Sequence, residues 1–138
     1  MPDPTSVAVI GATGYAGATA VSLLADHPHA RVVRATSRTY GGQNLAAVYP
    51  AAALDLELIS EPDPGDAEVV FVALPHGMAG SLAGAWLEEG RTVVDLGADF
   101  RLQDAAAYAR WYGAEHTAPQ LLGRAVFALP EVARERLR

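Results

Sequence analysis

Three glycines, Gly11, Gly14 and Gly17, follow the apolar run Val7–Ile10 and lead into a helix-forming segment that begins near Tyr15. A turn of this kind puts bare backbone N–H groups beside the partial positive charge of a helix N-terminus, an arrangement that binds phosphate. We interpret Gly11 as the tight turn, Gly14 as the point where a phosphate approaches, and Gly17 as a close helix–strand contact. The spacing is G-x-x-G-x-x-G, and a glycine triplet alone also fits a plain turn. The strand–turn–helix context favours a dinucleotide site.

The second position of interest lies about twenty residues further on, where NAD-binding folds carry an acidic residue for the ribose 2′-hydroxyl. This chain has Thr36, Ser37 and Arg38 there. A carboxylate would repel a 2′-phosphate, whereas a hydroxyl and a guanidinium bind one through charge-assisted hydrogen bonds. The alternative is a solvated loop arginine. The position at the end of a predicted strand favours NADP(H) over NAD(H), with Ser37 and Arg38 at the 2′-phosphate.

Two later loops follow apolar runs and should reach the same edge of a parallel sheet, where open α/β folds bind ligands. In the loop Leu74–Gly77 we expect the backbone, more than the imidazole of His76, to face the cofactor. In the other, Arg101 could bind a substrate phosphate or carboxylate, or pair with Asp99; spacing alone leaves both open. We assign no catalytic and no metal-binding residue. The predicted cofactor-binding residues are Gly11, Thr13, Gly14, Tyr15, Ala16, Gly17, Ser37, Arg38, Leu74, Pro75, His76 and Gly77.

The elements that position these loops alternate between strands and helices, which predicts an α/β fold with a Rossmann-type, doubly wound, mostly parallel sheet. Asp104 is expected to cap one helix, Pro130 to open the last, and Trp86 and Trp111 to pack inside. Strands are predicted over Val7–Ile10, Ala30–Ala35, Leu54–Ile59 (half-buried, at an edge), Glu68–Leu74 and Thr92–Leu96 (both buried) and Ala125–Leu129, with helices over 15–26, 78–89 and 105–112.

Composition narrows the class of protein. The 138 residues include 51% hydrophobic and 19% charged residues, which indicates a folded domain. The net charge of −6 argues against nucleic acid as a partner. Without lysine the chain cannot form a nucleotide-triphosphate P-loop, and without cysteine it has neither disulfides nor thiolate metal ligands. We find no signal peptide and no membrane-spanning run, and expect a cytoplasmic protein.

Taken together, the motifs resemble those of the N-acetyl-gamma-glutamyl-phosphate reductases, in family order and over nearly the whole chain. Members of that family reduce an acyl phosphate to an aldehyde with NADPH in arginine biosynthesis. A sister branch acts on aminoadipyl phosphate attached to a small carrier protein, in lysine biosynthesis. The segment 121–131 resembles the sister branch more, since Phe127 and Ala128 stand where the arginine branch more often has Tyr-Gly, and the branch stays open. The motifs are Gly11–Gly17, Thr36–Arg38, Ala73–Gly77, Asp99–Arg101 and Leu129–Glu131.

The resemblance implies that residues 11–17 and 74–77 contact the cofactor and that Arg101 binds the substrate phosphate. It also implies a homo-oligomer acting on a small acyl phosphate. The family's cysteine nucleophile, its histidine base and its second domain would all follow Arg138, so we expect residues 1–138 to be an NADP-binding Rossmann domain truncated before the catalytic and dimerisation domain. In the whole enzyme a thiolate attacks the acyl phosphate and expels phosphate, and NADPH then reduces the resulting thioester.

Other interpretations remain at this stage. A non-catalytic dinucleotide sensor, of the atypical short-chain dehydrogenase type, accounts for the glycines but not for the later two loops. Aspartate-semialdehyde dehydrogenase shares the fold and the chemistry, but the Asp-Phe-Arg and Leu-Pro-Glu segments fit it less well. A domain separated from its second half is also expected to expose apolar surface.

Overall fold

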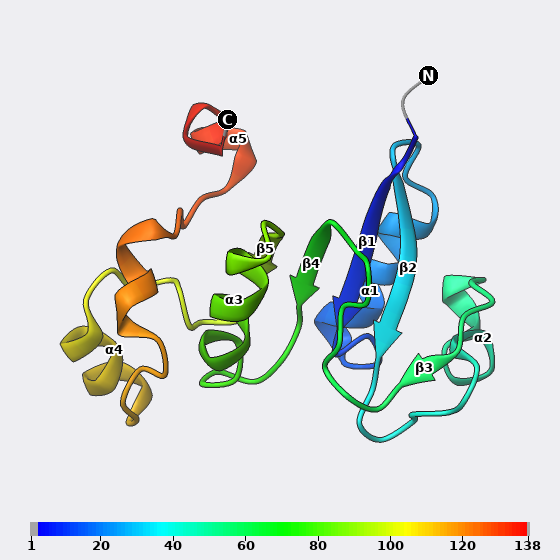
Figure 1. Ribbon diagram of the computed structural model, residues 1–138, viewed down its shortest axis with the longest axis horizontal. Helices are drawn as coiled ribbons and strands as arrows, with labels where there is room; N and C mark the ends of the chain where they lie inside the picture. The colour runs from blue at the N-terminus through cyan, green and yellow to red at the C-terminus, as the bar shows by residue number, and fades with distance from the viewer. Residues whose placement is uncertain (1–2, 138) are drawn as a thin grey trace.

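The computed structural model describes residues 3–137 and contains a parallel sheet of five strands (Figure 1). The order across the sheet is β3-β2-β1-β4-β5, and all of its ladders are parallel. This order reverses direction between β1 and β4, which is the doubly wound arrangement that the sequence predicts. The strands are β1 (Thr5–Ile10), β2 (Ala30–Thr36), β3 (Leu58–Ile59), β4 (Val69–Val72) and β5 (Thr92–Asp95).

The central strand β1 is apolar on both faces because helices cover both. Val7 and Val9 belong to one core cluster, together with Val21 of helix α1 (Tyr15–Ala25). The alternate residues of β1 belong to a second cluster, with Trp86 of helix α3 (Ala79–Glu88). Helices α1 and α3 therefore pack on opposite faces of the sheet, and Figure 1 shows α1 behind β1 and β2.

Shorter elements complete the described chain. Helix α4 (Ala105–Tyr112) has the predicted bounds, and Asp104 caps it by accepting hydrogen bonds from the N–H groups of Ala106 (3.3 Å) and Ala107 (3.1 Å). Among residues 3–137 no helix is both long and apolar enough to cross a membrane. The remaining elements are α2 (Leu45–Val48), η1 (Pro50–Ala52), α4 (Ala105–Tyr112), η2 (Pro119–Arg124), α5 (Pro130–Ala133) and η3 (Arg134–Leu137).

Four details differ from the sequence-based expectation. The predicted edge strand Leu54–Ile59 pairs with β2 only at its last two residues, although it does lie at the edge. No strand forms over Ala125–Leu129, which has no pairing partner in the described chain. Strand β5 ends the sheet and is only half-buried, and β4 alternates between buried and half-buried residues. Trp86 packs inside as predicted, but Trp111 is 71% exposed.

Some apolar surface is open to solvent beside α1. A hollow of about 640 Å³ is bordered by Tyr15 and Leu23 of α1, by Phe71 of β4 and by Leu96 after β5. Leu23 is 71% and Leu96 40% exposed. This surface agrees with the expectation that the domain exposes apolar side chains.

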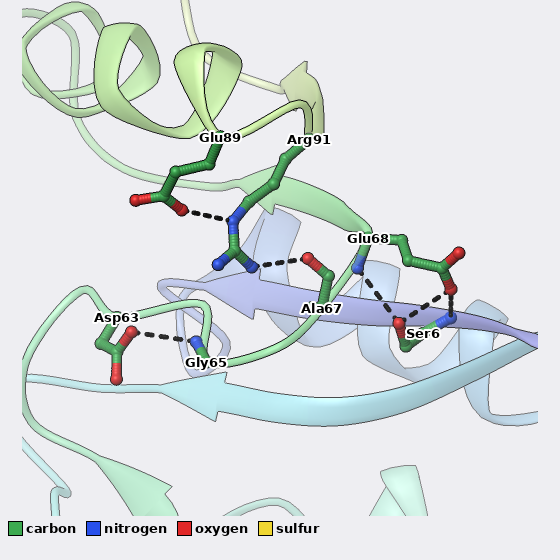
Figure 2. Close-up of polar contacts among 7 residues, drawn as sticks. All are labelled: Ser6, Asp63, Gly65, Ala67, Glu68, Glu89 and Arg91. Carbon is green, nitrogen blue, oxygen red and sulfur yellow. Dashed lines mark hydrogen bonds and ion pairs between the residues drawn. The ribbon is translucent and has the colours of Figure 1, made fainter.

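The amino-terminal ends of the strands are joined by polar contacts (Figure 2). The Ser6 N–H and hydroxyl both donate to the Glu68 carboxylate, at 3.0 and 2.9 Å, and lower the pKa of Glu68. The guanidinium of Arg91 donates to the Ala67 carbonyl (2.6 Å) and pairs with Glu89 (2.7 Å). These contacts hold β1, β4 and β5 together at the edge opposite the glycine turn.

Candidate functional site

The glycine turn lies directly after β1, and two of its glycines are required by the fold itself. Gly11 has φ +85°, a conformation that disfavours other residues, and a Cβ there would collide with the Ala73 carbonyl. A Cβ on Gly17 would collide with the Gly11 carbonyl. The start of α1 therefore rests on the backbone of the turn with no side chain between them, as the close-packing interpretation of Gly17 predicts.

The middle glycine, Gly14, is different because the fold does not require it. Its backbone is extended (φ −75°, ψ 169°), and among the described residues beyond its chain neighbours a Cβ there would meet only the Gly11 carbonyl oxygen, at an ordinary 3.7 Å. Gly14 caps α1 without a side-chain hydrogen bond, and the first turn carries no acidic residue. Within residues 3–137, the N–H groups of Tyr15 and Ala16 have no backbone or side-chain acceptor. This exposed helix end is suited to bind an anion.

The end of β2 is bound tightly to the glycine turn. The Thr36 carbonyl accepts from the Ala12 N–H (2.8 Å), and the Thr36 hydroxyl oxygen accepts from the Gly11 N–H (3.2 Å). The hydroxyls of Thr13 and Ser37 share a hydrogen bond of 2.7 Å. Thr36 and Ser37 are buried, at 3% and 4% exposed. The β2 loop and the turn therefore form one unit, and the Ser37 hydroxyl lies inside it.

Arg38, the next residue, has the opposite environment. It is exposed, and in the part of the chain that the structure describes its guanidinium forms no ion pair or hydrogen bond. A guanidinium without an internal partner at this position is available to an anionic ligand.

The loop Leu74–Gly77 lies next to the glycine turn because the Ala73 N–H donates to the Ile10 carbonyl (2.8 Å). Gly77 has φ +87°, so glycine suits the end of the loop. His76 is exposed, and its ring lies 5.6 Å from that of Tyr112, between centroids. The predicted cofactor residues from all three loops thus share the carboxyl edge of the sheet.

A buried carboxylate that the sequence analysis considered only as a partner of Arg101 lies behind this loop. Asp99 is 1% exposed and accepts from the N–H groups of Gly77 (2.6 Å) and Gly80 (2.9 Å) and from the Tyr108 hydroxyl (3.1 Å). Burial, followed by the hydrogen bond to Asp99, raises the pKa of Tyr108 to about 12. The N-terminus of α3 is therefore already occupied by an internal carboxylate, whereas that of α1 is open.

These contacts exclude one of the two roles that the sequence left open for Arg101, an ion pair with Asp99. Asp99 is engaged elsewhere, so Arg101 does not pair with it; its Nη2 lies 3.4 Å from the Gly97 carbonyl, and its guanidinium lies over the Phe127 ring, 5.8 Å from the centroid. The side chain is exposed at the same edge as the glycine turn. Arg101 as a ligand for an anionic substrate thus stays a prediction that the geometry permits.

Asp95, at the end of β5, is a further partly buried carboxylate. It accepts from the Gly97 N–H at 2.8 Å. Burial raises the pKa of Asp95, and the nearby Asp99 carboxylate adds to the rise. No cluster of three or more His, Asp or Glu residues suited to a metal ion occurs within residues 3–137. The arrangement can therefore bind a dinucleotide through backbone amides and a guanidinium, and the chain has no cysteine to act as a nucleophile.

Comparison with known proteins agrees with this geometry. The chain is 49% identical over 136 residues to the N-acetyl-gamma-glutamyl-phosphate reductase of Symbiobacterium thermophilum, covering 96% of this chain and 39% of the relative. It is 50% identical over 137 residues to the enzyme of the same name from Pseudomonas aeruginosa PAO1, covering 96% of this chain and 40% of that protein. The chain thus spans about 40% of the length of these curated relatives.

Solved structures agree in fold. Aspartate semialdehyde dehydrogenase with NADP from Candida albicans matches with a TM-score of 0.62 at 20% identity, covering 84% of this chain and 41% of that one. Aspartate semialdehyde dehydrogenase II complexed with ASA from Vibrio cholerae matches with a TM-score of 0.59 at 17% identity, covering 72% of this chain and 30% of that one. Residues 6–138 match the family described as semialdehyde dehydrogenase, NAD binding domain, and the chain belongs to this family.

Proposed function

We propose that this chain is the cofactor-binding part of an NADPH-dependent reductase that converts N-acetyl-gamma-glutamyl phosphate to its semialdehyde in arginine biosynthesis. The observation that carries the proposal is the start of α1, where no side chain caps the helix and, among residues 3–137, nothing accepts from the N–H groups of Tyr15 and Ala16 at the carboxyl edge of the sheet. The names of the curated relatives, at about 50% identity, support the substrate. Bound NADPH would supply the hydride; the residues of this chain bind and orient it.

The proposed cofactor site has three parts. The free amides at the start of α1 bind the diphosphate, with Gly14 leaving room for it. Arg38 binds the 2′-phosphate. Ser37, which the sequence analysis placed at the same phosphate, is buried and instead holds the β2 loop against the turn through Thr13. The loop Leu74–Gly77 lines the half of the site over β4, where the nicotinamide end of the dinucleotide lies in folds with this strand order.

The whole enzyme requires groups that this chain does not carry. The nucleophile is a cysteine of the remaining part of the protein, in keeping with a family whose curated members are more than twice as long. Arg101 binds the substrate phosphate, and the enzyme is a cytoplasmic homo-oligomer with a small-molecule substrate. The rival substrate is aminoadipyl phosphate on a carrier protein; the segment 121–131 favours it, whereas the names of the curated relatives favour the acetylated substrate.

Titration of the 138-residue chain with NADPH and NADH tests the cofactor assignment. Arg38→Ala should weaken NADPH binding about tenfold or more, because a charge-assisted hydrogen bond contributes roughly 1.5–3 kcal/mol, and should leave NADH nearly unchanged. Arg31→Ala is the matched control, since Arg31 is exposed at the other end of β2. Equal losses for both nucleotides in Arg38→Ala would contradict the 2′-phosphate role. Saturable binding of neither nucleotide by the wild-type chain would refute the cofactor-binding function.

A further inference from the structure

The Asp99 carboxylate joins three segments that are distant in the sequence. One oxygen accepts from the Gly77 N–H and the Tyr108 hydroxyl, and the other from the Gly80 N–H. Gly77 ends the Leu74–Gly77 loop, Gly80 lies in the first turn of α3, and Tyr108 lies in α4. Burial alone would not fix the orientation of this carboxylate, but the three hydrogen bonds that it accepts do.

The backbone of Asp99 is fixed as well. His116 is 7% exposed, and its Nδ1 accepts from the Ala118 N–H at 3.0 Å. The ring proton therefore lies on Nε2, which donates to the Asp99 carbonyl at 2.6 Å. Because both the carboxylate and the carbonyl of Asp99 are held, the residue acts as a fixed support for the loop in front of it.

We infer that Asp99 is a positioning residue for the nicotinamide half of the cofactor site. Its carboxylate fixes the Gly77 N–H and the start of α3, and so fixes the loop Leu74–Gly77 that lines this half. The inference rests on the proposed function, and it adds a role to a residue that touches no ligand. The adenosine half of the site, at the glycine turn and the β2 loop, is held by separate contacts of Thr36 and Ser37.

Asn is the informative replacement because it keeps the shape of the side chain. In Asp99→Asn one oxygen still serves Gly77 and Tyr108, but the amide NH₂ faces the Gly80 N–H, so two donors oppose each other. The start of α3 and the adjoining loop then lose their fixed position. Asp104→Asn is the matched control: it removes the same charge from the same region, and Asn caps a helix as well as Asp does.

The test compares two ligands on the 138-residue chain, below the melting temperature of each variant. NADPH spans both halves of the site, whereas adenosine 2′,5′-bisphosphate reaches only the adenosine half. Asp99→Asn should raise the Kd of NADPH about tenfold, the equivalent of roughly one hydrogen bond to a charged group, and leave the Kd of the bisphosphate within about twofold. Asp104→Asn should change neither.

A second variant keeps the inference testable if Asp99→Asn does not fold. Tyr108→Phe removes one donor and leaves both N–H contacts, and it should raise the NADPH Kd about threefold relative to that of the bisphosphate. A change in melting temperature without a change in the ratio of the two Kd values, in whichever variant folds, would overturn the positioning role. If the wild-type chain bound both ligands and the variants weakened both equally, the inference would fail while the proposed function stood. If the wild-type chain bound neither, both would fail.

Discussion

We expect Gly14→Ala to weaken the binding of NADPH while leaving the stability of the fold nearly unchanged. The new Cβ would lie 3.7 Å from the Gly11 carbonyl oxygen and, its two chain neighbours apart, meet no other atom of residues 3–137 within 4 Å, so the folded structure has room for it. The backbone at Gly14 suits alanine, which offsets the poorer capping of α1, and we expect the free energy of unfolding to change by less than about 0.5 kcal/mol.

The same methyl group would occupy the space through which a phosphate reaches the N–H groups of Tyr15 and Ala16. Loss of two charge-assisted hydrogen bonds, at roughly 1.5–3 kcal/mol each, predicts an increase of about a hundredfold or more in the Kd of NADPH. Calorimetric titration measures the Kd, and thermal denaturation without ligand measures stability.

Gly17→Ala is the reference variant for this experiment. Its Cβ would lie 2.8 Å from the Gly11 carbonyl carbon and 3.0 Å from the Ala12 Cα, so the backbone must shift and stability should fall by about 1–3 kcal/mol. If Gly14→Ala bound NADPH as tightly as the wild-type chain does, the diphosphate would not lie at the start of α1, and the reasoning would be wrong.

Three further predictions follow from groups whose pKa values are shifted. Asp95 has a raised pKa in the folded chain, so its ionised form destabilises the fold above that pKa, and this destabilisation disappears as the pH falls towards the ordinary value of 3.8. Asp95→Asn should therefore raise the melting temperature at pH 7, and the increase should become smaller towards pH 4. Tyr108 should give a tyrosinate absorbance step near pH 12 that is absent in Tyr108→Phe, and a titration without this difference would contradict the burial of its hydroxyl beside Asp99. Glu68 has a lowered pKa, so it stabilises the fold above its ordinary value of 4.5 and loses this effect in acid; Ser6→Ala should raise the Glu68 pKa, measured by NMR, and an unchanged pKa would assign the shift to the Ser6 N–H alone.

The elements that were predictable from the sequence are those whose signals are local. The apolar run before Gly11 becomes β1, and the helix capped by Asp104 ends at Tyr112 as predicted. The parallel sheet follows from the alternation of strands and helices. The close packing of Gly17 against the backbone of Gly11 was also predictable, because backbone contact between a helix and a strand requires glycine.

What was missed depends on contacts between distant segments. Nothing near Asp99 in the sequence indicates that its partners are two backbone N–H groups about twenty residues earlier. Apolar content alone suggested a strand at Ala125–Leu129, but a strand needs a pairing partner, and Phe127 and Leu129 are 60% and 66% exposed. Trp111 was expected inside for its size, yet α4 turns Tyr108 inward and leaves Trp111 in solvent.

The backbone contact between Gly17 and Gly11 affects how fast a ligand can bind. The turn cannot move without displacing both α1 and β1, so the amides are aligned before any ligand arrives. Most of the conformational entropy lost on binding is then the ligand's own. Association at such a preorganised end of the domain requires no slow rearrangement, and its rate is set by encounter and by the attraction of the nearby guanidinium for phosphate.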